Sequence, residues 1–66
     1  MRFNIGKYEV EIMESGGIER YKIFLKGREV YQEYSEPLPL RKKVLSARRM
    51  IKNYENRISM IEAANM

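Results

Sequence analysis

A regular series of apolar side chains in the C-terminal part of the chain constrains its fold more than any other feature. The spacing alternates between four and three residues, which on an α-helix places these side chains on one face. The series consists of Leu40, Val44, Ala47, Ile51, Tyr54, Ile58 and Ile61. Because neither glycine nor proline follows Pro39, the sequence predicts one uninterrupted helix over about residues 39–64.

The part of the chain before this helix has the two-residue alternation of apolar and charged side chains that is typical of half-buried β-strands. Glycine-containing turns at residues 14–17 and 26–27 separate three such stretches. The second stretch covers about residues 18–26 and the third about residues 28–34. The sequence therefore predicts an α+β fold, in which a three-stranded antiparallel β-meander is followed by one long C-terminal α-helix (β-β-β-α).

The chain is expected to form a single domain, residues 1–66, because it is too short for a second hydrophobic core. In this domain the sheet occupies about residues 2–34, a proline-containing crossover occupies residues 35–39, and the helix occupies about residues 39–64. We expect the helix to cover the apolar face of the sheet, because an antiparallel sheet with one apolar face needs such a cover.

The apolar positions change parity at Gly6, and this leaves two alternatives for the residues before it. A β-bulge at Gly6 would bring Phe3 and Ile5 to the same face of the sheet as Tyr8 and Val10. Without a bulge, Phe3 and Ile5 would face outward. We expect the bulge.

In the third predicted strand, Val30 and Tyr34 are expected to face the helix, which directs Tyr31 and Glu33 outward. The outward face then presents aromatic and basic side chains, on which the bases of a nucleic acid could stack. These possible sheet-face contacts are Arg20, Lys22, Phe24 and Tyr31. Glutamates expected on the same face argue against this mode of binding, because they repel a phosphate backbone.

The predicted helix is longer than the predicted sheet. A helix of about 24 residues measures ~36 Å, whereas strands of about seven residues span only ~23 Å. The apolar end of the helix is then left uncovered, unless the helix breaks near Asn53 or Asn56 and folds back, or the sheet is larger than predicted. We expect a homodimer, because a chain this small gains stability from extra buried area. The predicted dimer interface consists of Tyr54, Ile58, Met60 and Ile61.

The net charge of +4 is unevenly distributed along the chain. Residues 1–36 contain six Lys/Arg and seven Glu, whereas residues 37–66 contain seven Lys/Arg and two Glu. One flank of the predicted helix is basic and includes an apolar residue, which is typical of a contact surface for an acidic partner. This flank consists of Arg41, Lys42, Leu45, Arg48, Arg49 and Lys52. A simpler alternative is a solvated helix face that only keeps the protein soluble.

The residue types give little support for catalysis. The sequence contains no Cys, no His and no Asp, and we find no nucleophile motif, phosphate-binding glycine loop or metal cluster in it. We therefore expect a non-enzymatic protein with no metal and no small-molecule cofactor. The sequence also has neither the apolar run of a signal peptide nor a membrane-spanning segment, so we expect no membrane partner and a cytoplasmic location.

Together these features predict a small binding or regulatory protein, a phage- or mobile-element-like adaptor or inhibitor. It is expected to be a homodimer through the C-terminal half of its helix and to dock on an acidic partner protein through the basic flank. Direct binding of that flank to DNA or RNA is the alternative. Three methionines are expected to contribute an adaptable contact surface: Met50, Met60 and Met66.

Overall fold

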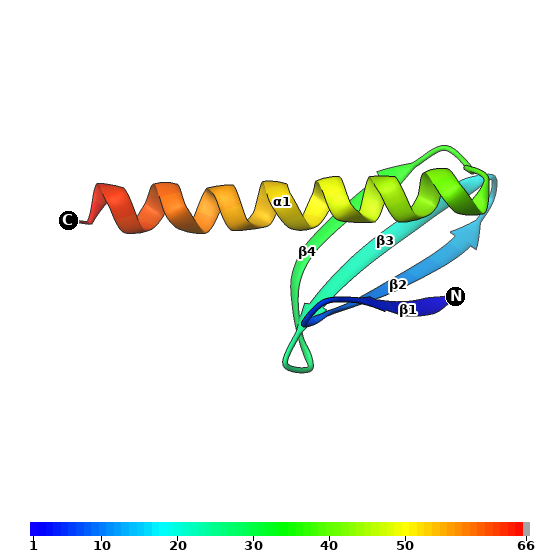
Figure 1. The fold of residues 1–66 in the computed structure, drawn as a ribbon. Helices are drawn as coiled ribbons and strands as arrows, with labels where there is room; N and C mark the ends of the chain where they lie inside the picture. Colours follow the sequence, from blue (N-terminus) through cyan, green and yellow to red (C-terminus); the bar gives the residue numbers. More distant parts are fainter. Residues whose placement is uncertain (66) are drawn as a thin grey trace.

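The computed structural model describes residues 1–65 as a four-stranded antiparallel sheet with one long helix across one face (Figure 1). The strands lie side by side in the order of the sequence. The elements are β1 (Arg2–Ile5), β2 (Tyr8–Ser15), β3 (Ile18–Leu25), β4 (Arg28–Ser35) and α1 (Leu40–Ala64). The predicted α+β class and the C-terminal helix are confirmed, but the sheet has four strands where three were predicted. Met66 lies outside the described residues.

The additional strand arises at Gly6, where the prediction of a bulge is wrong. Gly6 and Lys7 form a two-residue turn, so that Phe3 pairs with Val10 and Ile5 with Tyr8. The positive φ of Gly6, 57°, suits the first position of a type II′ hairpin turn, in which a side chain would be strained. Because a two-residue turn keeps paired residues on one face, Phe3 and Ile5 still reach the helix-covered face, as expected.

A second difference lies in β4, where the register shifts by one residue. Tyr31 pairs with Ile23, but Glu29 already pairs with Phe24, so Val30 is an extra residue in the strand. An extra residue reverses the alternation of the side chains that follow it. The structure therefore corrects three predicted orientations: Tyr31 and Glu33 face the helix, and Tyr34 faces solvent.

The hydrophobic core lies between α1 and the two inner strands. It consists of Tyr8, Val10, Ile12, Tyr21, Ile23, Ala47, Met50 and Ile51. Ala47 and Ile51 of the predicted stripe are buried, but Met50 is fully buried and Leu40 is 60% exposed, so the buried face of α1 is rotated partly from the predicted stripe toward Met50. The rotation follows from the position of the helix, whose backbone lies closest to β3 and β4. The predicted role of Met50 in an adaptable surface is therefore wrong.

The C-terminal part of α1 extends beyond the sheet (Figure 1), and the molecule measures 43 × 20 × 19 Å. The helix is continuous, so it does not break near Asn53 or Asn56. The Tyr8 hydroxyl donates a hydrogen bond of 2.9 Å to Glu55, close to where the helix leaves the sheet. Beyond this point the apolar side chains remain exposed: Ile58 by 38%, Met60 by 72% and Ile61 by 57%. The predicted uncovered helix end is confirmed.

A buried ion pair joins the sheet to the start of the helix. Glu19 is only 3% exposed, and its carboxylate lies 2.9 Å from the Lys43 ammonium and accepts a hydrogen bond of 3.0 Å from the Leu38 amide. Burial alone raises the pKa of this carboxyl, but the Lys43 and Leu38 hydrogen bonds outweigh burial and lower the pKa overall. The sequence pattern did not reveal the pair, although Glu19 has the same parity as the buried Tyr21.

The hydroxyl of Tyr21 is buried near the Glu19 carboxylate, but no group among residues 1–65 lies in good hydrogen-bond geometry with it. Burial, and then the charge of Glu19, raises the pKa of this hydroxyl. We expect Tyr21→Phe to increase the free energy of unfolding by up to about 1 kcal/mol, because it removes an unsatisfied polar group and keeps the ring. Urea titration followed by circular dichroism measures the change. A decrease of similar size would show that the hydroxyl is hydrogen-bonded in solution.

Candidate functional site

The N-terminal half of α1 presents cations and one leucine to solvent on the side that faces away from the sheet. Helical spacing places these side chains together, because residues three or four apart share a face. We call this surface the basic helix face, and it consists of Arg41, Lys42, Leu45, Arg48 and Lys52, all exposed. None of the salt bridges found within residues 1–65 involves any of the four cations. Their charge is therefore available to a partner.

Other cations of α1 are held by the protein itself. Arg49 donates a hydrogen bond to Glu33 on β4, and this contact is the main cause of the lowered pKa of the Glu33 carboxyl. The guanidinium of Arg57 lies over the Tyr31 ring, 5.1 Å from its centre. Arg49 was predicted in the basic flank, but the structure gives it a role in attaching α1 to the edge of the sheet. The sequence could not show this, because Glu33 was expected on the opposite face.

The centre of the basic helix face is apolar. Leu45 is 61% exposed and lies within one turn of Arg41, Arg48 and Lys42 along the helix. Residues 40–52 contain six cations and no acidic residue. Such a surface attracts an anionic partner over a distance and gives it one apolar contact at close range.

On the outer face of the sheet, which α1 does not cover, basic side chains form ion pairs with neighbouring glutamates along most of the face. Arg2 pairs with Glu9 and Glu11, and Lys22 lies 3.6 Å from Glu29. The predicted contacts Arg20, Lys22 and Phe24 do lie on this face, as their strand pairing shows. Tyr31 does not, because the extra residue in β4 turns it toward the helix.

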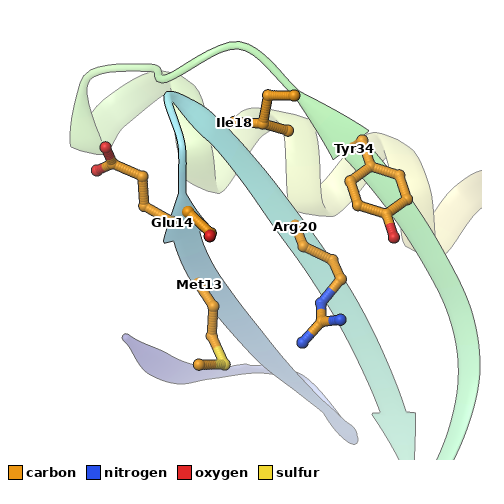
Figure 2. Close-up of a pocket in the computed structure, with 6 residues that line it drawn as sticks. Met13, Glu14, Ile18, Arg20 and Tyr34 are labelled. Atoms are coloured by element: carbon orange, nitrogen blue, oxygen red, sulfur yellow. The ribbon is translucent and has the colours of Figure 1, made fainter.

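One end of the outer face forms a shallow hollow that the sequence did not predict (Figure 2). Met13, Arg20 and Tyr34 are cross-strand neighbours on β2, β3 and β4, and Ile18 lies beside them. The hollow has a volume of about 370 Å³. Arg20 makes no salt bridge within the described residues, so this end of the sheet combines a free cation with exposed apolar side chains. The shift in β4 brings Tyr34 here, which explains why sequence periodicity missed the hollow.

The residues predicted for a dimer interface divide into two groups. Tyr54 is half-buried and packs edge-to-face on Tyr8, with ring centres 6.2 Å apart. Ile58, Met60 and Ile61 are exposed on the free end of α1. Since two residues advance a helix by about 200°, Met60 points away from Ile58. The four residues therefore do not form one continuous surface.

The described residues were also compared with metal sites, membrane-spanning helices and known proteins. Within residues 1–65, no three His, Cys, Asp or Glu side chains come together in a way that could hold a metal ion. No helix among these residues has the length and apolarity needed to cross a lipid bilayer. Comparison of the chain with protein-family models, curated proteins and solved structures finds no match.

Proposed function

We propose that the protein is a small non-enzymatic binding protein, an adaptor or inhibitor that acts as a homodimer and docks on an acidic surface of another protein. The basic helix face is the docking surface. The observation that carries this proposal is the group of four exposed cations that form no salt bridge within the described residues. Two other cations of the same helix, Lys43 and Arg49, are instead paired with Glu19 and Glu33 of the sheet.

The exposed Leu45 favours a protein partner over a nucleic acid. A leucine at the centre of a charged surface contributes binding energy when an apolar group of the partner covers it. Phosphate groups would gain nothing from this side chain. An acidic helix or strand that carries apolar residues matches both features, because its carboxylates meet the cations and its apolar side chains cover Leu45.

Direct binding to DNA or RNA is the alternative, and the same four cations favour it. Neutralised phosphates release counterions, so the logarithm of the affinity falls linearly with the logarithm of the salt concentration, by about 0.9 per phosphate for duplex DNA. If all four cations contact phosphates, the expected slope is about −3.6. Binding to a protein that covers Leu45 is expected to give a smaller slope, because the apolar contact does not depend on salt.

The double substitution Lys42→Glu with Lys52→Glu tests the docking surface. Both side chains are exposed, so the fold should be retained, and we expect affinity for a labelled peptide of Glu and Leu to fall by about tenfold or more, because attraction becomes repulsion. The matched control is Lys7→Glu with Arg28→Glu, which makes the same change in net charge at exposed positions outside α1. Fluorescence anisotropy at several salt concentrations measures both variants, with a short DNA duplex as the second probe.

The outcomes separate the two candidate functions. Equal losses in the variant and its control would mean that net charge alone drives binding, and this would overturn the proposed surface. Leu45→Ser should weaken binding of the peptide and leave binding of the duplex unchanged. A duplex that binds more tightly than the peptide, with the steep salt slope, would replace the protein-docking proposal by the nucleic-acid alternative.

A further inference from the structure

A groove between β1 and α1 is lined by apolar side chains that the rest of the domain covers only partly. Its volume is about 520 Å³, and its apolar lining includes Phe3, Ile5, Leu40 and Val44. The groove exists because the backbone of α1 lies closest to β3 and β4, whereas β1 is the strand at the opposite edge of the sheet (Figure 1). Arg48 lies at the rim of this groove.

The free end of α1 has the properties that such a groove requires of an occupant. It extends beyond the sheet of its own subunit, and Ile58 and Ile61 are exposed on it. It carries Glu55 and Glu62 against a single cation, Arg57, in the segment 53–64. The groove lies instead beside residues 40–52, which contain no acid and four cations that form no salt bridge within the described residues. The two ends of the same helix are therefore complementary in charge, and each exposes apolar side chains.

We propose that the groove between β1 and α1 of each subunit is filled by the free end of α1 from a second copy, in a reciprocal antiparallel dimer. This inference rests on the proposed homodimer and defines its interface and orientation. A two-fold axis at the level of Ile51, whose side chain itself stays in the core of its own subunit, makes the exchange symmetric, because each subunit then supplies one groove and one helix end. This two-fold rotation buries both uncovered apolar regions, the groove between β1 and α1 and the free end of α1.

The spacing along α1 agrees with this arrangement. Val44 and Ile58 lie seven residues before and after Ile51, and Leu40 and Glu62 lie eleven residues before and after it. Seven and eleven residues are close to two and three helical turns, at about 3.6 residues per turn, so all these residues follow one line along the helix. In the antiparallel pair Val44 then lies opposite Ile58 of the second copy, and Leu40 lies opposite its Glu62.

Charge selects the antiparallel orientation. A parallel pair would place the two segments 40–52 side by side, and their cations would repel each other. The antiparallel pair places each of these segments beside a helix end that carries Glu55 and Glu62 of the other copy. The helix dipoles also oppose each other in this arrangement, which is the favourable orientation for neighbouring helices.

Cysteine cross-linking tests the orientation directly, because the chain has no cysteine of its own. Leu40→Cys and Glu62→Cys are both substitutions at exposed positions, so each single variant should fold, which circular dichroism verifies. We expect a mixture of the two variants to form a cross-linked dimer under mild oxidation or with a short bis-maleimide. Each variant alone should give little cross-linked product, because the two cysteines of one kind lie at opposite ends of the dimer.

Molecular mass provides the second measurement. Light scattering is expected to give twice the chain mass of 7.9 kDa, and Ile58→Asp should reduce it to the mass of the monomer. Met60→Asp is the matched control and should remain dimeric, because Met60 points away from Ile58 on the helix. A mass of one chain at every concentration, or cross-linking of Glu62→Cys with itself, would overturn the proposal. Neither result would affect the docking surface, which the Lys42 and Lys52 variants test separately.

Discussion

Replacement of Met50 by alanine is expected to unfold a large fraction of the protein at room temperature. Met50 is fully buried between α1 and the sheet, and removal of a buried methionine side chain costs about 2–5 kcal/mol. A domain of this size has little stability to lose, because it buries only about 60% of its unfolded surface. Thermal and urea denaturation of Met50→Ala, followed by circular dichroism, measures the loss.

The matched control is Met60→Ala on the same helix. Met60 is exposed, so the same change in side chain should alter the free energy of unfolding by less than about 0.5 kcal/mol. If both variants lost the same stability, burial could not be the cause of the loss at Met50, and the core position of Met50 would be contradicted. Its position also explains why the buried face of α1 differs from the predicted apolar stripe.

Replacement of Lys43 by methionine is expected to cost about 3 kcal/mol near neutral pH, because it leaves the buried Glu19 carboxylate without its cation. In the native protein the pKa of Glu19 is lowered. The pair therefore contributes its stability above about pH 4.5, and this contribution is lost as the pH falls through the lowered pKa. In the variant, burial should raise the pKa of Glu19, so acid neutralises a carboxylate that destabilises the fold.

The difference between the two proteins should therefore shrink as the pH is lowered from 7 toward 4. Urea denaturation at several pH values measures it. Lys52→Met is the control, because Lys52 is exposed and belongs to none of the salt bridges within the described residues. A constant difference across the pH range would mean that Lys43 stabilises the fold only by packing of its aliphatic chain.

Local sequence patterns were sufficient to predict the long helix, its uncovered apolar end and the turns after β2 and β3. These features depend on spacing and on glycine, both of which act over a few residues. The change in the parity of the apolar residues at Gly6 was also recognisable in the sequence. A β-bulge and a hairpin turn, however, both bring Phe3 and Ile5 to the face that α1 covers. The pattern of side chains could not distinguish them, because it records which residues share a face and not how the chain connects them.

The candidate site was predicted in part. The cations and Leu45 of the basic helix face follow from helical spacing, and the structure shows these side chains exposed together. The contact between Arg49 and Glu33 could not be predicted from helical spacing. Glu33 faces the helix only because the extra residue Val30 reverses the alternation of side chains in β4. The same shift moves Tyr34 to the outer face and creates the hollow around Arg20 (Figure 2).

The sequence by itself thus determined the secondary structure of the C-terminal half and the charge of its exposed surface, because both depend on neighbours along one helix. Only the tertiary structure decided that Met50 is buried while Leu40 is exposed, that Lys43 pairs with Glu19 while Arg41 forms no salt bridge within residues 1–65, and that a groove opens beside β1. These outcomes depend on where the helix crosses the sheet. That position is set by packing between residues far apart in the sequence, such as Met50 and Ile23 in the common core.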